Sequence, residues 1–326
     1  MRLTLSLSVL CAALFLSSLL VGPASFSASH GLSALFINDG TPVSVIMREI
    51  RLPRALLAAI IGAGLGLSGA ALQGYLRNPL AEPGLIGVSA SAALGAVVAL
   101  QTGMAMAFPF ALPVAALVCA CISVVLLLAL AGPGGSSLTL ILAGIAISAL
   151  AGALTTLTLN LSPNPFATSE IVFWMMGSLA DRSMSHVWLV LPFAVVGGVV
   201  LFSLRRGLMA LSLGEDAAAA MGFNLASMRF LLVFGIALIV GASTAVAGAI
   251  GFVGLVVPHI LRPLVGGNPG RLLMASALGG AAMILAADIA VRLVLPERDL
   301  KLGVLTAMVG APLFLHLILK TRRGLA

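Results

Sequence analysis

Charged residues are scarce in this chain of 326 residues. Asp, Glu, Lys and Arg make up only 8% of it, whereas soluble globular domains carry about 25%. The mean hydropathy is +1.20, and 61% of the residues are hydrophobic. A soluble domain has no means of burying this much apolar surface, so the soluble fold classes are excluded. Apolar runs of about 20 residues, without alternation of polar and apolar positions, predict an all-α integral membrane protein.

Residues that carry catalytic or metal chemistry are also few. The chain has three cysteines, and their odd number argues against a disulfide framework. No His, Cys, Asp and Glu residues have the spacing of a metal site, and neither a phosphate-binding glycine loop nor a nucleophile elbow occurs. We therefore expect no catalytic residue, no metal site and no bound cofactor, and the chain is not predicted to be an enzyme.

Ionisable residues are nearly absent from the apolar runs, so a self-contained proton- or sodium-coupled pump would lack its usual relay. Asp288 and Arg292, near the end of one run, form the one candidate pair, and helix stabilisation accounts for them equally well. A secondary transporter stays open as the alternative of another class. Uphill transport is nevertheless expected to draw its energy from a separate subunit.

Ten apolar segments are candidates for transmembrane helices. They lie at about residues 3–22, 53–76, 85–103, 109–131, 138–161, 187–204, 229–249, 252–266, 272–293 and 302–319. The eighth is short and contains Pro258, His259 and Arg262. The first has a second interpretation as a cleaved signal peptide, because one arginine precedes it and small residues follow it.

Small residues recur every four positions inside three of these segments. The rows are Gly62, Gly66, Ala70 and Gly74, then Gly144, Ser148, Gly152 and Thr156, then Gly241, Ala245 and Ala249. Such rows let helix backbones approach closely in lipid, so they predict tightly packed helices.

Lys and Arg residues set the expected orientation. With both termini in the cytoplasm, more of the 17 basic residues fall inside than outside. Most of those outside gather at residues 48–54 and 292–301, on the face that the positive-inside rule disfavours, which suggests a docking surface for an acidic partner. Nucleic acid is not an expected partner despite a pI near 10.6, because the basic residues stand singly or in pairs between apolar runs.

Two polar loops stand out on the side predicted to be cytoplasmic. The loop at 212–224, "SLGEDAAAAMGFN", has acids followed by an alanine run and a glycine near each end. This pattern predicts a short helix with its acids in the first turn, where the helix dipole favours them. The loop that begins "RNPLAEPG" at residue 77 contains Pro79 and Pro83, which forbid a continuous helix.

Three stretches, taken in order, resemble the FecCD family of binding-protein-dependent permeases. They are "RLPRALLAAIIGAGLGLSGAALQGYLRNPLAEPGLIGVS", "LSLGEDAAAAMGFN" and "AGAIGFVGLVVPHILR", and the resemblance extends from about residue 45 to the C-terminus. Members of this family are the membrane subunits of importers for ferric siderophores, haem and cobalamin. The resemblance implies a single transmembrane permease domain over residues 1–326, ten spans in a cobalamin-permease-like bundle, and a functional homodimer with the path along its two-fold axis.

The resemblance also implies the partners. Two cytoplasmic ATPase subunits would hold ATP and Mg and hydrolyse the ATP, and a periplasmic substrate-binding protein would deliver the cargo. The chain is then a multi-pass protein of the bacterial inner membrane, in contact with the lipid bilayer, with both termini cytoplasmic.

The resemblance assigns roles to individual residues of this sequence. Docking of the binding protein falls to Arg51, Arg54 and Arg292. Coupling helices at 212–228 would sit on the ATPase, with Gly214, Glu215, Asp216, Ala218 and Gly222 as the matching positions. The cytoplasmic gate corresponds to Asn78, Leu80, Ser136 and Ser137, and residues 165–183 match a short outer helix.

The cargo is not encoded as clearly. Ferric siderophore is the first expectation, on the frequency of cargoes in the family, with haem or cobalamin as alternatives. Only 5% of the residues are aromatic, and the spans lack the convergent polar groups of a tight ligand site. We therefore expect the chain to hold its cargo weakly and the binding protein to set specificity.

Overall fold

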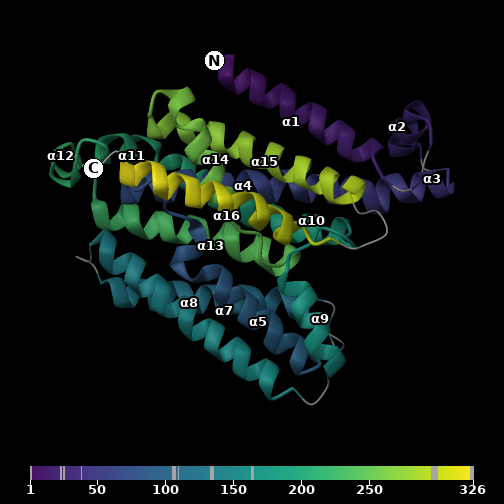
Figure 1. Ribbon diagram of the computed structural model, residues 1–326, viewed down its shortest axis with the longest axis horizontal. Coiled ribbons are helices and arrows are strands. Elements are labelled where there is room, and N and C mark those ends of the chain that lie inside the picture. The colour runs from purple at the N-terminus through teal and green to yellow at the C-terminus, as the bar shows by residue number, and fades with distance from the viewer. Residues whose placement is uncertain are drawn as a thin grey trace.

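The computed structural model describes residues 2–22, 24, 26–37, 39–104, 108, 110–132, 136–162, 165–294 and 300–323. The regular elements in this part of the chain are all helices, which confirms the predicted all-α class. Figure 1 shows long helices lying side by side, joined at two ends by loops and short helices. These ends are termed the α2 end and the α12 end, after α2 (Ala28–Phe36) and α12 (Glu215–Ala220).

Seven helices within the described ranges are long and apolar enough to cross a membrane. They are α1 (Arg2–Leu20), α4 (Leu52–Leu76), α7 (Ala111–Ala131), α8 (Ser137–Asn160), α10 (Met184–Ser203), α13 (Leu225–Ala247) and α15 (Pro269–Val294). Each coincides with a predicted span. The crossing that contains α4 begins earlier than predicted, because α3 (Pro42–Val45) and the π-helical turn η1 (Ile46–Arg51) continue directly into it.

Two further predicted spans coincide with helices whose apolar parts are shorter: α5 (Val88–Gln101), and α16 (Leu302–Arg323), which is apolar over Leu302–His316. The remaining prediction, a helical crossing at 252–266, is not confirmed as a single spanning helix. The chain there forms α14 (Val253–Leu261) and the 3-10 turn η3 (Pro263–Val265). A helix of nine residues is about 14 Å long, roughly half the thickness of the hydrocarbon core.

The chain that leads into α14, residues 248–252, is not helical. Gly248 lies against the backbone of Trp174, in α9 (Pro165–Met175) near the α2 end. Gly254 lies against Leu65 and Gly69, in the half of α4 that is nearer the α12 end. Residues 248–252, Gly-Ala-Ile-Gly-Phe, are apolar whether or not they are helical, so hydropathy alone did not place the start of α14.

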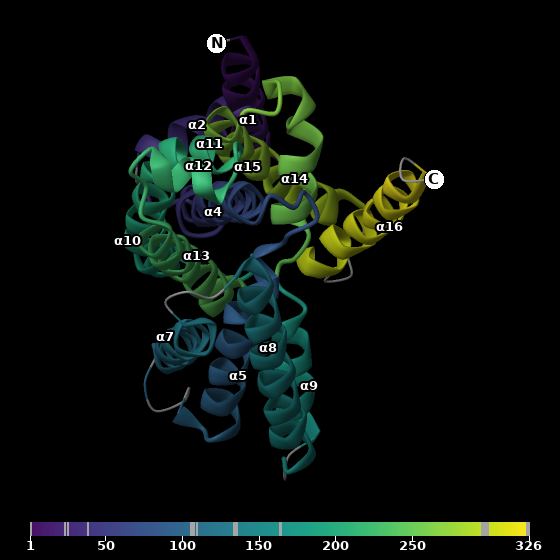
Figure 2. The same cartoon turned by 90° about the vertical axis from the view of Figure 1, so that its left-hand side faces the viewer.

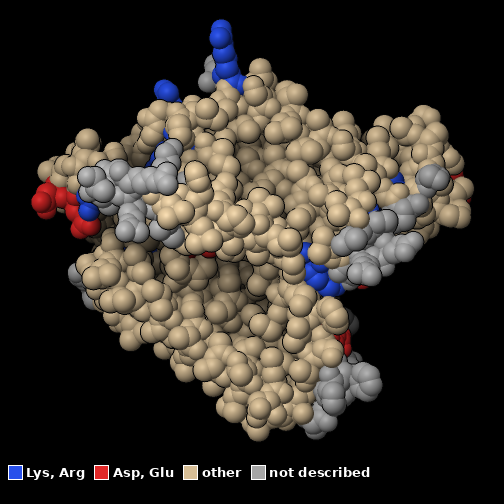
Figure 3. Space-filling model, viewed as in Figure 1, with Lys and Arg blue, Asp and Glu red and all other residues tan. Residues whose placement is uncertain are grey.

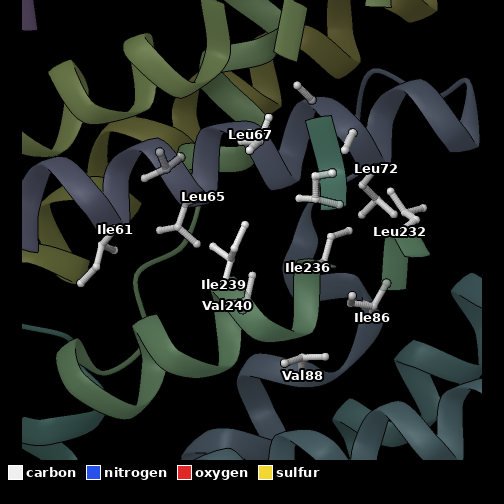
Figure 4. Packing of buried hydrophobic residues seen from close by; sticks show 14 of the residues in the cluster. Ile61, Leu65, Leu67, Leu72, Ile86, Val88, Leu232, Ile236, Ile239 and Val240 are labelled. Atoms are coloured by element: carbon white, nitrogen blue, oxygen red, sulfur yellow. The ribbon is translucent and has the colours of Figure 1, made fainter. Parts of the chain in front are cut away.

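Helix α4 lies at the centre of the bundle and contacts α10, α13, α14 and α15. Every residue from Gly64 to Tyr75 is buried. Figure 4 shows Leu65 and Leu72 of α4 packed with Ile236 and Ile239 of α13. A helix enclosed on all sides needs no polar face, which explains why its sequence is almost uniformly apolar.

Glycine brings α4 into backbone contact with its neighbours. A Cβ atom on Gly62 or Gly66 would clash with the backbone of Gly280 or Ser276 in α15, and one on Gly69 would clash with Gly254 in α14. The first row of small residues therefore packs as predicted. The second row packs only in part, since Gly144 meets the turn η2 (Pro83–Ile86) at Leu85, whereas nothing lies within 4 Å of a Cβ on Gly152.

On the face drawn in Figure 3, few charged residues lie over the middle of the bundle, and acidic residues gather over α12 at one end. This is the distribution that a bilayer requires, because charge in the hydrocarbon core is costly. Figure 2 shows α5, α7, α8 and α9 grouped on one side of α4 and α13, and α16 extending away beside α14.

The glycine contacts generate the first prediction. Gly66→Leu should push α4 and α15 apart, and overpacking of this kind costs about 1–3 kcal/mol or more. We expect a lower melting temperature and less monodisperse protein in size-exclusion chromatography. Gly152→Leu adds the same side chain where the chain leaves space, so it should behave like the wild type, and equal damage by both changes would contradict this packing.

Candidate functional site

The three arginines predicted to dock a partner lie together at the α2 end. Arg54 of α4 donates from Nε to Oδ1 of Asp288 over 2.8 Å, and Nη2 of Arg292 forms an ion pair with Oδ2 of the same carboxylate at 3.0 Å. Asp288 is fully buried. One carboxylate of α15 therefore holds guanidinium groups from two helices, which compensates its own burial.

The other side of this cluster binds the end of α1. The last turn of a helix leaves carbonyl groups without helical partners. Arg51 and Arg292 donate to backbone carbonyls in and just after this turn, at 2.7–3.0 Å: those of Ser18, Leu19, Leu20, Val21 and Ala24. Cations at the C-terminus of a helix are also favoured by its dipole. The cluster thus fastens α1 to α4 and α15.

Little of the arginine cluster reaches the surface. Arg51 is 4% exposed, and its guanidinium lies 4.4 Å from the centre of the Phe26 ring. The side chain of Arg292 is 7% exposed and that of Arg54 is 17% exposed. The sequence interpretation placed all three arginines toward a partner. In this structure the three arginines lie together, and Arg54 is the most exposed of them, whereas Arg51 and Arg292 are almost wholly buried.

At the α12 end, the predicted short helix is present as α12. Glu215 and Asp216 form its first turn. Gly214 and Gly222, with φ of 114° and 86°, adopt backbone conformations that favour glycine, which explains the glycine on each side of the helix. The amide of Phe223 donates to the carbonyl of Ala218 and that of Gly222 to Ala219, so α12 ends in a Schellman motif.

Side chains of α12 divide between the bundle and the solvent. Ala218 is fully buried and belongs to the main hydrophobic core, so it fastens α12 to the bundle. Leu213 and Met221, which flank the helix, are 72% and 60% exposed. The sequence interpretation singled out Ala218 and missed these two, because a pattern of alanines does not reveal which face of a short helix is covered.

An ion pair joins α12 to the end of α4. Nη2 of Arg77 lies 3.5 Å from Oε1 of Glu215, and both side chains are about half exposed. Arg77 is the residue that ends α4, with φ of 52°. It directly precedes Asn78, so the predicted gate segment begins where α12 touches α4.

The predicted gate residues serve as turn and cap residues in this chain. Asn78 accepts a hydrogen bond from the amide of Leu80 at 2.9 Å, and Ser136 caps α8 by accepting one from the amide of Thr139 at 3.2 Å. Ser137 is the first residue of α8. No hydrogen bond joins the two gate segments within the portion of the chain that is described, so the gate stays a prediction for an assembly of two copies.

A buried polar residue that sequence reasoning missed ties the gate segment to α14. Gln73 is 1% exposed. Its Nε2 donates to the carbonyls of Ala81, Gly254 and Leu255 at 3.2–3.3 Å, and its Oε1 accepts from Arg262 at 2.7 Å. Next to it, the carboxylate of Glu82 accepts from the amide of Phe252. Because buried amides are costly to leave unpaired, α4, the gate segment and α14 are expected to move together.

The short outer helix predicted at 165–183 is present as α9, followed by a loop to α10. A cavity of about 370 Å³ opens beside it at the α2 end. Its walls carry both aromatic and charged side chains, among them Glu170, Trp174, Arg182, His186 and Lys301.

Comparison with known proteins places this geometry in context. The FecCD transport family matches residues 10–320. The chain is 36% identical over 300 residues to the uncharacterized ABC transporter permease protein YvrB of Bacillus subtilis (strain 168), which covers 90% of this chain and 84% of that relative. It is 39% identical over 323 residues to the vitamin B12 import system permease protein BtuC of Salmonella newport (strain SL254), covering 99% and 96%.

Solved structures also match this chain. A transporter assigned to the metal-chelate type of ABC transporters, in an inward-facing conformation, matches with a TM-score of 0.87 and 34% identity, over 98% of this chain and 99% of that one. PsaBC from Streptococcus pneumoniae in complex with Fab matches with a TM-score of 0.57 and 15% identity, over 89% and 94%, and shows likeness of fold alone.

The arginine cluster generates the second prediction. Arg51→Gln leaves carbonyls at the end of α1 without donors, and each unpaired buried group costs about 1–3 kcal/mol. We expect a clear fall in the melting temperature of the purified protein in detergent. Arg48→Gln, one turn earlier and only half-buried, is the control and should have little effect. A stable Arg51→Gln protein would show that the hydrogen bonds to α1 do not matter.

Proposed function

Because the chain belongs to the FecCD transport family, whose compared relatives are permease subunits of ABC transporters, we propose that it forms the path of an ATP-driven importer of a metal chelate. The observation that carries this proposal is the match over 98% of the chain to a transporter assigned to the metal-chelate type. ATP hydrolysis belongs to a separate subunit, and this chain is not an enzyme. ATP and Mg would be held by two ATPase subunits.

The α12 end is assigned to the cytoplasm and the α2 end to the periplasm. The excess of basic residues supports this orientation, since Arg77, Arg205, Arg206, Arg229 and Arg271 all lie at or next to helix ends on the α12 side. Both termini would then be cytoplasmic in the bacterial inner membrane. Two copies of the chain would pair around the path, with Asn78, Leu80, Ser136 and Ser137 forming its inner gate.

The segment around α12 is proposed as the contact with the ATPase. Leu213 and Met221 are large apolar side chains that are mostly exposed beside two acids, and apolar groups of this kind mark partner surfaces. Movement of α12 would reach the gate segment by two routes: the buried Ala218, and the ion pair of Glu215 with Arg77. Because Gln73 donates hydrogen bonds to Gly254 and Leu255 of α14, this helix would be displaced together with α4.

The arginine cluster is proposed as the docking site of the periplasmic binding protein. Arg54 is the residue best placed to meet an acidic group, since it has the largest exposed part of the three. Arg51 and Arg292 would act mainly by holding the end of α1 beside it. Electrostatic docking of this kind weakens as salt increases.

Ferric siderophore remains the first choice of cargo, with cobalamin and haem as alternatives. The relative from Salmonella newport is named for vitamin B12 import, which supports cobalamin. The match to a transporter assigned to the metal-chelate type supports ferric siderophore and cobalamin alike. A self-contained secondary transporter is disfavoured by geometry. Asp288 and Arg292, the candidate relay, are occupied by Arg54 and by the end of α1.

The function is tested by transport in proteoliposomes. The permease is reconstituted with its ATPase, the binding protein is added outside, and uptake of ferric siderophore, haem or cobalamin is measured. Uptake of one chelate that requires both ATP and the binding protein is expected. Uptake driven by a proton or sodium gradient without the ATPase would overturn the proposal in favour of a secondary transporter.

Coupling through α12 generates the third prediction. Leu213→Glu and Met221→Glu should each weaken co-purification of the ATPase about tenfold, because a charge enters an apolar contact. Leu161→Glu is the matched control at the α2 end, where the leucine is 70% exposed. Ala218→Leu should differ from all three by lowering the melting temperature, since Ala218 faces the core. Normal ATPase association of the Leu213 and Met221 variants would exclude this surface.

A further inference from the structure

An open groove lies between α10 and α15, over α4, close to the α12 end. Its volume is about 670 Å³. Apolar side chains of three helices form most of its wall: Leu67 of α4, Val199 and Phe202 of α10, and Met274 and Ala277 of α15. Arg205 and Arg206, the first residues of α11 (Arg205–Leu211), close it at the α12 end.

The two arginines have no acidic partner among the described residues. Both are exposed, and no Asp or Glu in the described part of the chain forms an ion pair with either of them. The guanidinium of Arg205 lies 5.3 Å from the centre of the Phe202 ring, at the border between the charged and the apolar part of the groove. The groove therefore offers unpaired positive charge at its α12 end only, and most of the rest of its wall is apolar.

The apolar wall on α10 is followed directly by the two arginines. Gly198 and Ser203, which mark the ends of the α10 part of the groove, are about 7.5 Å apart at 1.5 Å per residue, and Arg205 lies just beyond the turn at Leu204. A ligand that fits must be anionic at one end and apolar for at least this length along α10. A free anion would cover the arginines but leave the apolar wall bare.

We infer that this groove binds an anionic phospholipid, with its phosphate on Arg205 and Arg206 and an acyl chain against Val199, Phe202 and Met274. Basic pockets between transmembrane helices on the cytoplasmic side are known to take such head groups. The assignment to the cytoplasmic leaflet rests on the proposed function, whereas lipid binding itself does not. Phosphatidylglycerol is the simplest lipid of this class.

The site has a consequence for α12. Helix α11 is packed into the core through Leu208 and Leu211, and it leads to α12 through turns in which the amides of Leu213 and Gly214 donate to Ala210 and Leu211. A lipid held on Arg205 and Arg206 would restrain the start of α11. It would thereby help to fix the position of α12 on the bundle.

Native mass spectrometry of the purified full-length protein tests the inference. Titration with phosphatidylglycerol should give tightly retained lipid, and phosphatidylcholine should be retained much less. The double change Arg205→Gln with Arg206→Gln should weaken phosphatidylglycerol retention about tenfold. Arg2→Gln is the control: Arg2 is exposed at the start of the spanning helix α1, away from the groove, and its change should leave retention unchanged.

A second variant separates the lipid from a free anion. Gly198→Leu fills the groove without touching the arginines, since a Cβ there would be 3.8 Å from its nearest neighbour, Leu67. It should also weaken phosphatidylglycerol retention, and millimolar inorganic phosphate should not displace the lipid. Equal retention of both lipids, equal loss with Arg2→Gln, normal retention by Gly198→Leu, or displacement by phosphate would each overturn the inference.

A functional readout follows in nanodiscs. The rate at which the bound ATPase hydrolyses ATP should depend on phosphatidylglycerol content when the permease is wild type, and should not depend on it when the permease carries the double arginine change. Loss of ATPase binding together with normal lipid retention would mean that the two arginines serve the ATPase instead, and would overturn the inference. If no ATPase associates with any variant, the proposed function fails, but the mass-spectrometric result still decides the lipid site.

Discussion

The burial of α4 is the constraint on which the rest of this structure depends. Its glycines allow backbone contact with α15 on one side and α14 on another, and α10 and α13 enclose what remains. In lipid there is little hydrophobic gain from bringing helices together, so close packing must supply the stability. A helix held this tightly cannot bend or rotate alone, and displacement at one of its ends has to be taken up by its partners.

Both ends of α4 carry the polar groups that the other elements bind. At the α2 end, Arg51 and Arg54 meet the end of α1 and Asp288, and at the α12 end Gln73 and Arg77 meet α14 and α12. The proposed docking surface and the proposed coupling surface are thus organised from one central helix. If both surfaces act as proposed, α4 would be the element through which events on one side of the membrane bear on the other.

Much of the architecture was predictable, because hydropathy reports lipid burial directly. The helical class, seven spanning helices and the acidic turn of α12 between its glycines were all read from local patterns. The pattern failed where local sequence does not determine conformation or direction. The segment predicted as a span at 252–266 contains a helix of only nine residues. The predicted residues Arg51 and Ala218 face inward, because their partners are distant in sequence and no local pattern reveals them.

With the proposed orientation, the buried contacts of Arg51 and Arg292 would also account for basic residues on the face that the positive-inside rule disfavours. The positive-inside rule concerns cations in loops that face water. A guanidinium that satisfies the free carbonyls of a helix end and pairs with a buried carboxylate is not such a charge, since it is part of the packed structure. An acidic group of a docking protein at Arg54 would compete with Asp288, and that carboxylate also holds Arg292 at the end of α1. Docking at this site would therefore be linked to the position of α1, and the strength of the link would depend on how Asp288 divides its charge between the two arginines.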